Sequence, residues 1–309
     1  MTPISDTSPP VTSTTPTPTT TTSPKIPISL TGVSKTLLIP LIARAYDNSL
    51  PTPILADPYP AAVLSKLSFD IDSMPTTPFQ NAGISLRTKH FDDWTSSFLR
   101  TNHDTTVLHL ACGFDSRAQR VSWSEGTRWI DIDLPEVIEL RKEDLPLSFP
   151  TGNDQEYSLL GIDVTGETWM RDLDIGDGPV LVIMEGLLSY LPEKEVRALL
   201  TRICETFPQG EIIFECVSSP VLNWLNRPES MNAVKNTGAV FKSAVDDPMT
   251  LENLHSGLKL VENVSLLLAP GTEKFPLLGR VRMYLSSWFQ SGRDSARFLR
   301  FRFGQELLK

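Results

Sequence analysis

The chain contains 309 residues, 40% of them hydrophobic, and carries a formal net charge of −9 at pH 7. The apolar content excludes a fully disordered chain. The net negative charge argues against a partner that is a nucleic acid or an anionic membrane surface. Three scattered cysteines, Cys112, Cys204 and Cys216, lack a C-x-x-C motif, so we expect neither a disulfide framework nor a metal site.

The distribution of apolar and polar residues bears on the cellular location of the protein and on its ordered region. No basic-then-apolar leader opens the chain, and no apolar stretch approaches the roughly 18 residues that span a bilayer. We therefore expect a cytoplasmic protein. Residues 1–24 are almost wholly Thr, Ser and Pro, which have too little apolar surface to offset the entropy of ordering them. The sequence predicts a disordered tail over residues 1–26 and one domain over residues 27–309.

Helical patterns dominate the part of the domain before residue 104. Apolar residues recur at helical spacing over residues 35–46, where Pro40 is expected to start or kink a helix. Asp57 and Pro58 are a helix-start signal for the segment that follows them. Residues 81–100 read as one long helix.

After residue 104, short apolar strands alternate with helical segments. This alternation is typical of a parallel sheet with crossover helices, and near-continuous apolar runs indicate strands covered on both faces. The expected strands are residues 105–111, 127–133, 157–163, 178–185, 210–217 and 257–268, and the expected helices are 115–123, 134–144, 192–207 and an amphipathic stretch near 279–290.

Small or acidic residues follow the first four of these strands. Ligands of open parallel sheets bind beyond the carboxyl ends of the strands, so these positions are the ones to inspect. Gly113 would let the backbone approach an adenosyl ligand, and Asp133 would accept hydrogen bonds from both ribose hydroxyls. Asp163 would accept from an adenine amino group while Val164 packs on the ring. Glu185 would face a cationic ammonium or sulfonium group.

Each position also has a purely structural interpretation. The turn around Gly113 could serve tight packing alone. Asp115 and Asp133 could each cap the helix that follows. The series of strand ends is therefore a stronger signal than any single member.

Seven segments together resemble the leucine carboxyl methyltransferase family, which includes the tetracenomycin-type polyketide O-methyltransferases. The resemblance covers about residues 30 to 216 in order. In the core it rests on "ACGFDSRAQR", "RWIDIDLPEVIELRK", "GIDVTGETW" and "VIMEGLLSYLPEKEVRALLTRI". Upstream it rests on "TGVSKTLLIPLIARAYDN", "ILADPYPAAVL" and "LRTKHFDDW".

The resemblance implies an S-adenosylmethionine-dependent methyltransferase with a Rossmann-like class I α/β fold. It implies a mostly parallel seven-stranded sheet with helices on both faces. An N-terminal helical cap is expected over residues 27–103. The core is expected over residues 104–309, with a lid insertion at about 218–250.

The same resemblance assigns roles to individual residues. Arg87 matches the arginine that pairs with the methionine carboxylate, a task suited to a bidentate guanidinium, although without the resemblance we would read it as a surface residue. Gly113 matches the second glycine of a Gly-x-Gly turn. Asp133 matches the ribose-binding acid, with Asp131 as the fallback. Asp163 and Val164 match the adenine contacts, and Glu185 matches the acid near the methionine end.

Ala111 departs from the family pattern, because glycine is usual at this position. Alanine adds a methyl group and disfavours a positive φ. Cofactor binding survives if the backbone has a negative φ and the methyl points aside, and otherwise the affinity falls. Because the rest of the motif is intact, we expect binding to survive.

The nature of the acceptor is less defined by the sequence. A carboxylate acceptor needs no base, whereas a phenol benefits from one. Tyr190, His255 and His90 are candidate bases or orienting groups, and His90 and His109 lie in apolar sequence contexts that favour a packing role. The apolar residues of the predicted lid, which include Trp224, Leu225, Met231 and Phe241, suit an aromatic or aliphatic ligand.

We therefore predict an O-methyltransferase that acts on a hydroxyl or carboxyl oxygen of a small molecule, of the polyketide-type secondary metabolite class. One alternative is a protein C-terminal carboxyl methyltransferase. Another is a protein that keeps the fold and binds ligand without methylating it, for which Ala111 is the only indication. The oligomeric state is not predicted.

Overall fold

The computed structural model describes residues 25–144, 156–230 and 232–304. Residues 1–24 of the predicted tail lie outside this range. Ile26, which the sequence placed at the end of that tail, belongs instead to a short parallel ladder of β1 (Ile26–Pro27) and β2 (Leu67–Ser68).

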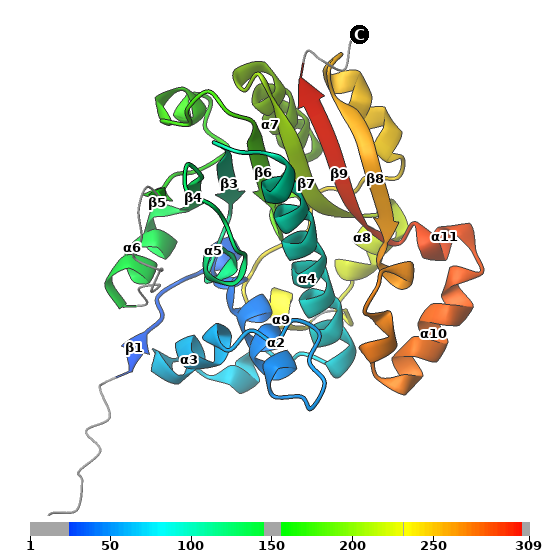
Figure 1. Cartoon of the computed structure of the whole chain (residues 1–309). Coiled ribbons are helices and arrows are strands. Elements are labelled where there is room, and N and C mark those ends of the chain that lie inside the picture. Colours follow the sequence, from blue (N-terminus) through cyan, green and yellow to red (C-terminus); the bar gives the residue numbers. More distant parts are fainter. Residues whose placement is uncertain (1–24, 145–155, 231, 305–309) are drawn as a thin grey trace, which may run out of the picture.

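A seven-stranded sheet forms the centre of the molecule, with the strand order β5-β4-β3-β6-β7-β9-β8 (Figure 1). The first five strands in this order are parallel, and β9 runs antiparallel to both of its neighbours. The predicted mostly parallel sheet is therefore confirmed. Its strands are β3 Thr106–Leu110, β4 Arg128–Asp133, β5 Glu156–Gly161, β6 Val180–Met184, β7 Gln209–Val217, β8 Lys259–Ser265 and β9 Ala296–Gly304.

The two faces of the sheet each bury a separate hydrophobic cluster. Alternate residues of a strand point to opposite faces, and in β6 Val182 belongs to one cluster whereas Leu181 and Ile183 belong to the other. The first cluster includes Leu199 and Ile203 of α7 (Glu193–Thr206). The second includes Phe91, Trp94 and Phe98 of α4 (Pro78–Thr101), which crosses the sheet in Figure 1.

Helix α4 begins earlier than the sequence pattern indicated. Thr77 accepts a hydrogen bond from the Gln80 N–H at 3.2 Å, and Gln80 Oε1 accepts one from the Thr77 N–H at 2.9 Å. This reciprocal capping box, followed by Pro78 in the first helical turn, fixes the start of the helix. The helix therefore runs 24 residues.

Two other predicted helices need adjustment. Helix α2 (Leu38–Asn48) begins two residues before Pro40, so the proline sits in the first turn, where its missing N–H costs no intrahelical bond. The helix expected over residues 115–123 is a single turn, α5 (Arg117–Arg120), because the chain becomes extended again at Val121.

The remaining helices lie around the sheet edge and the cavity beside it. Helix α10 (Leu277–Ser287) leaves most of its apolar side chains exposed, and Met283 is its one buried residue.

None of the helices within the described ranges is long and apolar enough to cross a membrane. The α-helices not yet given bounds are α1 Gly32–Lys35, α3 Tyr59–Lys66, α6 Pro135–Asp144, α8 Ser219–Leu225, α9 Asn232–Lys235 and α11 Gln290–Arg293, and the short 3-10 turns include η3 Leu188–Tyr190, η4 Pro248–Leu254 and η5 Leu266–Leu268.

Candidate active site

A cavity of about 1410 Å³ lies at the carboxyl ends of the parallel strands. Its walls come from the cap helices α2 and α4, from the ends of β3 to β7, from the segment after β7, and from α10. This is the edge of the sheet at which ligands of open parallel sheets bind. The volume is larger than the 300–1,000 Å³ typical of a single small-molecule site, so two ligands could share it.

The turn after β3 has a left-handed backbone at two positions. Ala111 has φ 53° and Gly113 has φ 50°. A Cβ on Gly113 would come within 3.2 Å of the Cβ of Leu37, which precedes α2, so glycine is favoured there both by its φ and by this close approach. Ala111 takes the unfavourable conformation with its methyl group in place, at a cost of about 1 kcal/mol.

Charged side chains on either side hold this turn in place. The Gly113 N–H donates to Asp133 Oδ2 at 2.7 Å. Arg141 of α6 is fully buried and donates to the carbonyls of Gly113 at 2.9 Å and Asp115 at 2.7 Å. These contacts over-determine the backbone of the turn, which explains how Ala111 is kept at a positive φ.

The two aspartates of β4 have different surroundings. Asp133 lines the cavity, and its other oxygen accepts from the Leu134 N–H at 2.7 Å. Burial raises the pKa of the Asp133 carboxyl, although the backbone N–H groups act in the opposite direction. Asp131 is buried away from the cavity and accepts from Arg141 at 2.7 Å and Trp129 at 2.8 Å. The fallback candidate Asp131 is therefore not brought to the site.

Asp163 and Val164 lie next to Asp133 along the cavity edge. Asp163 Oδ1 accepts from the backbone and the hydroxyl of Thr165 at 2.9 and 2.8 Å, which forms a local turn. Its side chain is exposed to the cavity edge, whereas Val164 is 7% exposed and packs in the core below. Both predicted adenine-contact residues therefore line the cavity.

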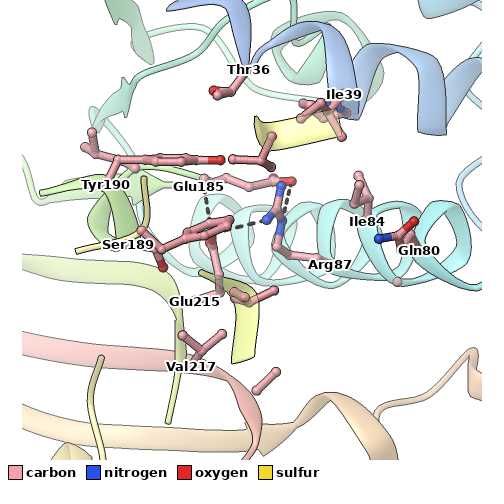
Figure 2. Close-up of a pocket in the computed structure, with 18 of the residues that line it drawn as sticks. Thr36, Ile39, Gln80, Ile84, Arg87, Glu185, Ser189, Tyr190, Glu215 and Val217 are labelled. Carbon is pink, nitrogen blue, oxygen red and sulfur yellow. Dashed lines mark hydrogen bonds and ion pairs between the residues drawn. The ribbon is translucent and has the colours of Figure 1, made fainter. Parts of the chain in front are cut away.

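Arg87 of α4 and Glu185 after β6 form an ion pair in the centre of the cavity wall (Figure 2). Arg87 Nε donates to Glu185 Oε1 at 3.0 Å, and Thr88 Oγ1 donates to the same oxygen at 2.7 Å. Arg117 Nη2 donates to Glu185 Oε2 at 2.5 Å. Burial alone would raise the pKa of Glu185, but Arg87 and Arg117 outweigh it and lower the pKa to about 2. Glu185 is therefore fully ionised, and Arg87 is not the surface residue that the sequence alone suggested.

Glu215 of β7 is a cavity residue that the sequence reasoning missed. Its Oε1 accepts from Arg87 Nη1 at 3.2 Å and from the Gly186 N–H at 2.8 Å. Its Oε2 is buried and has no hydrogen-bond partner within the described part of the chain. Burial raises the pKa of Glu215, and the neighbouring Glu185 adds to this effect while Arg87 opposes it. The signal in the sequence was an acid near the carboxyl end of an apolar strand, which carries a second acid, Glu211, near its start.

A network of buried ion pairs lies behind the turn after β3. Asp115 pairs with Arg44 and Arg120, each at 2.9 Å, and these arginines come from α2 and α5. His109 lies against Arg117 at 3.2 Å and against Asp131 at 3.4 Å. His109 is buried, as a packing role requires, but its ring nitrogens face Arg117 and Asp131 rather than apolar side chains.

The structure separates the three candidate bases. Tyr190 lines the cavity and stacks on Phe241 with ring centroids 5.0 Å apart, and burial raises its pKa to about 12. His90 packs against Trp94 at 4.4 Å and does not line the cavity. Of the three, only Tyr190 reaches the site.

His255 lies near the opposite end of the central strands from the cavity. Its Nδ1 accepts from the Gly257 N–H at 3.1 Å, and Gly257 packs on the backbone of Gly304. Gly304 pairs with Gln209, the first residue of β7, whereas the cavity surrounds the far end of that strand. The structure therefore does not bring His255 to the candidate active site.

The segment between β7 and η4 forms one wall of the cavity. Trp224, Leu225 and Phe241, three of the apolar residues expected in a lid, line the cavity, and Trp224 is 50% exposed at its rim. Met231 lies outside the described residues. The role of this segment as a lid stays a prediction.

Comparisons with known proteins find relatives over most of the chain. The family model for leucine carboxyl methyltransferase matches residues 38–204. The tetracenomycin polyketide synthesis O-methyltransferase TcmP of Streptomyces glaucescens is 35% identical over 274 residues, which are 89% of this chain and 95% of that protein. The S-adenosyl-L-methionine-dependent methyltransferase dpfgK of Gibberella zeae is 36% identical over 258 residues, which are 78% of this chain and 84% of that protein.

Solved structures support the fold. A Thermobifida fusca protein assigned as a methyltransferase superposes with a TM-score of 0.52 at 16% identity, covering 85% of this chain and 95% of its own. A duf574 family protein of Streptomyces avermitilis superposes with a TM-score of 0.51 at 13% identity, covering 85% and 97%. At these identities the likeness concerns the arrangement of strands and helices alone.

Proposed function

Since the chain belongs to the leucine carboxyl methyltransferase family, we infer that it transfers a methyl group from S-adenosylmethionine to an oxygen atom. It is an S-adenosylmethionine-dependent methyltransferase. We propose that the acceptor is a hydroxyl or carboxyl oxygen of a small molecule, of the kind found in polyketide-type metabolites. The name of the Streptomyces glaucescens relative supports this class of acceptor.

The observation that carries the proposal is the order of side chains along one cavity edge. Asp163, Asp133, Gly113 and Glu185 follow the neighbouring strands β5, β4, β3 and β6 in that spatial order. We assign the adenine to Asp163 and Val164 and the ribose to Asp133, whose carboxylate oxygens can each accept a further hydrogen bond. Gly113 leaves space for the ligand because it carries no Cβ.

The methionine end fits beside Arg87. Arg87 Nη2 makes no hydrogen bond to the described part of the chain. It lies close to Gly186, since a Cβ built on Gly186 would be 3.7 Å from this nitrogen. A carboxylate can therefore bind the open edge of the guanidinium while Glu185 holds its other edge. When bound, S-adenosylmethionine supplies an electrophilic methyl group on a sulfonium sulfur. The chain's own contribution is to orient both ligands and to exclude water.

The apolar wall opposite this row supports a small-molecule acceptor. The apolar wall residues outside the row from β5 to β6 include Phe79, Ile84, Val217, Leu266, Leu278 and Phe298. Such a surface binds an aromatic or aliphatic ligand, with few polar groups to fix its orientation.

Calorimetry with S-adenosylhomocysteine tests the proposed function. We expect wild-type protein to bind, Arg87→Ala to bind about 30-fold more weakly or not at all, and Arg87→Lys to lie between them, because a charge-assisted bidentate pair is lost. Arg100→Ala is the matched control, since Arg100 is exposed near the end of the same helix and should leave the affinity within twofold. Absence of binding to the wild type at high micromolar concentration would refute the proposal.

The acceptor can be identified by methyl transfer. Protein supplied with S-adenosylmethionine labelled in its methyl group is incubated with a metabolite extract of the source organism. Mass spectrometry of the labelled product then gives the acceptor class. Label that appears only in protein would overturn the small-molecule assignment.

A further inference from the structure

Two partly buried glutamates share Arg87, and only one of them has an oxygen left to bind a ligand. Glu185 uses both oxygens, one for Arg87 and Thr88 and the other for Arg117. Glu215 uses Oε1 alone, for Arg87 and the Gly186 N–H. Its Oε2 is covered from water and has no partner in the described residues. A buried carboxylate oxygen without a donor is costly, so a ligand that brings a donor is favoured there.

The place of Glu215 in the sheet points to the acceptor rather than to the cofactor. The proposed cofactor residues occupy the ends of β5, β4, β3 and β6, and Glu215 lies on β7, the next strand beyond that row. Val217 on the same side of the strand lines the cavity, and Glu215 pairs in register with Phe298 of β9, which also lines it. In Figure 2 Glu215 lies between Arg87 and Val217, on the side of Arg87 opposite Thr36 and Ile39.

We propose that Glu215 Oε2 is the proton acceptor for the substrate oxygen, an assignment that rests on the proposed function. As the substrate oxygen forms its bond to the methyl carbon, the carbon–sulfur bond breaks and its electron pair stays on sulfur. The proton of the substrate O–H passes to Glu215 Oε2. The products are the methylated oxygen, the thioether and the protonated Glu215, so charge and atoms balance.

This assignment defines the substrate class more narrowly. The substrate must bring a proton to the site, as a phenol, an enol or an un-ionised carboxylic acid does. A pre-ionised carboxylate would place a third negative charge next to Glu215 and Glu185, which share Arg87. Because burial raises the pKa of Glu215 towards neutrality, the group is better matched to proton transfer than Glu185.

The variant Glu215→Gln separates the possible roles of Oε2. Glutamine keeps an oxygen for Arg87 and Gly186, so the fold is expected to survive, which thermal unfolding checks. We expect the affinity for S-adenosylhomocysteine to stay within fivefold of the wild type by calorimetry. We expect the rate of methyl transfer to fall about 100-fold. In the wild type the rate should decrease at low pH as Glu215 is protonated, and this acid limb of the pH–rate profile should disappear in Glu215→Gln.

Two further variants complete the test. Glu215→Asp keeps a carboxyl group and should keep the acid limb at a reduced rate. Glu205→Gln removes an exposed charge near the end of α7, away from the cavity, and should match the wild type in both measurements. Nuclear magnetic resonance of protein labelled with carbon-13 at the glutamate carboxyls identifies Glu215 by the resonance that is missing from Glu215→Gln. In the wild type this resonance should titrate with a pKa above the ordinary value of a glutamate.

The outcomes separate this inference from the proposed function. An affinity for S-adenosylhomocysteine that falls more than fivefold in Glu215→Gln would overturn the inference, because Oε2 would then hold the cofactor. Transfer that keeps its rate and acid limb in Glu215→Gln would overturn it as well. Failure of the wild type to bind S-adenosylhomocysteine would instead refute the proposed function itself.

Discussion

Ala111 carries backbone strain at the centre of the proposed cofactor turn. Its φ of 53° is the left-handed conformation that only glycine adopts without cost. Arg141 holds the carbonyls of Gly113 and Asp115, so the turn cannot relax by changing the φ of Ala111 alone. The sequence-based condition for undisturbed binding, a negative φ, is therefore not met, and the surrounding contacts must hold the geometry instead.

Glycine at position 111 should relieve this strain. We expect Ala111→Gly to raise the free energy of unfolding by about 0.5–1 kcal/mol, since the relief at positive φ exceeds the greater entropy of glycine in the unfolded chain. Ala111→Val should lower it by about 2 kcal/mol, because a β-branched residue is disfavoured further at this φ. Urea unfolding measures both changes.

The control for this pair is a change from alanine to glycine within a helix. Ala82 in α4 is helical and 8% exposed, so Ala82→Gly should destabilise the protein by about 1 kcal/mol. A loss of stability in Ala111→Gly comparable to that in Ala82→Gly would contradict the strained conformation.

The residues of the candidate site that lie at the carboxyl end of a strand could be predicted from the sequence. Gly113, Asp133, Asp163 and Glu185 were identified in this way, and the structure places all of them on the cavity. Glu215 escaped because it lies two residues inside its strand, where only the tertiary position of α4 and Arg87 makes it a cavity residue. A linear pattern does not contain that contact.

At the level of elements, the sequence located strands better than helix ends. Every expected strand is present, and the continuous apolar runs of β3 and β6 mark strands that are buried on both faces. The start of α4 was placed three residues late, because the apolar period begins only after the capping box that starts the helix. Helix α5 was overestimated, because Arg117 and Arg120 are used for buried ion pairs rather than for an exposed helical surface.

The capping box of α4 gives a prediction at this scale. Thr77→Ala removes the hydroxyl that accepts the Gln80 N–H, and we expect it to lower the free energy of unfolding by about 1 kcal/mol. Ser96→Ala in the middle of the same helix should lie within about 0.5 kcal/mol of the wild type. Equal effects of the two substitutions in urea unfolding would show that the cap does not stabilise the helix.

For the whole molecule, buried charges join the cap to the sheet. Asp92 of α4 accepts from Arg117 Nε and Arg120 Nε, each at 2.7 Å, and Arg120 also pairs with Asp57 at 2.8 Å. Arg44 of α2 reaches Asp115 beside the turn. The helices that precede the sheet in sequence are therefore tied to the turn after β3 by charge as well as by apolar packing, and we infer that these helices and the sheet unfold together.

This arrangement predicts a loss of stability in acid. Burial alone would raise the pKa of Asp115, but Arg120, Arg44 and Arg117 outweigh it and hold the pKa well below its usual range. A carboxyl whose pKa is lower in the folded state stabilises the protein above its unfolded pKa, near pH 4. This stabilisation is lost as the pH falls towards the folded value. The free energy of unfolding should therefore fall steeply below about pH 4.5, in part because of Asp115.

Asp115→Asn tests this contribution, with Asp93→Asn as its control. The uncharged amide would leave three arginines with one fewer anion, and we expect about 3 kcal/mol of destabilisation at pH 7. Because the titrating group is gone, the variant should also lose stability less steeply than the wild type between about pH 5 and pH 3. Asp93 is exposed in its pair with Lys89, so its variant should stay within about 0.5 kcal/mol at every pH. Urea unfolding at a series of pH values measures all three proteins, and parallel pH profiles for Asp115→Asn and the wild type would contradict the coupling.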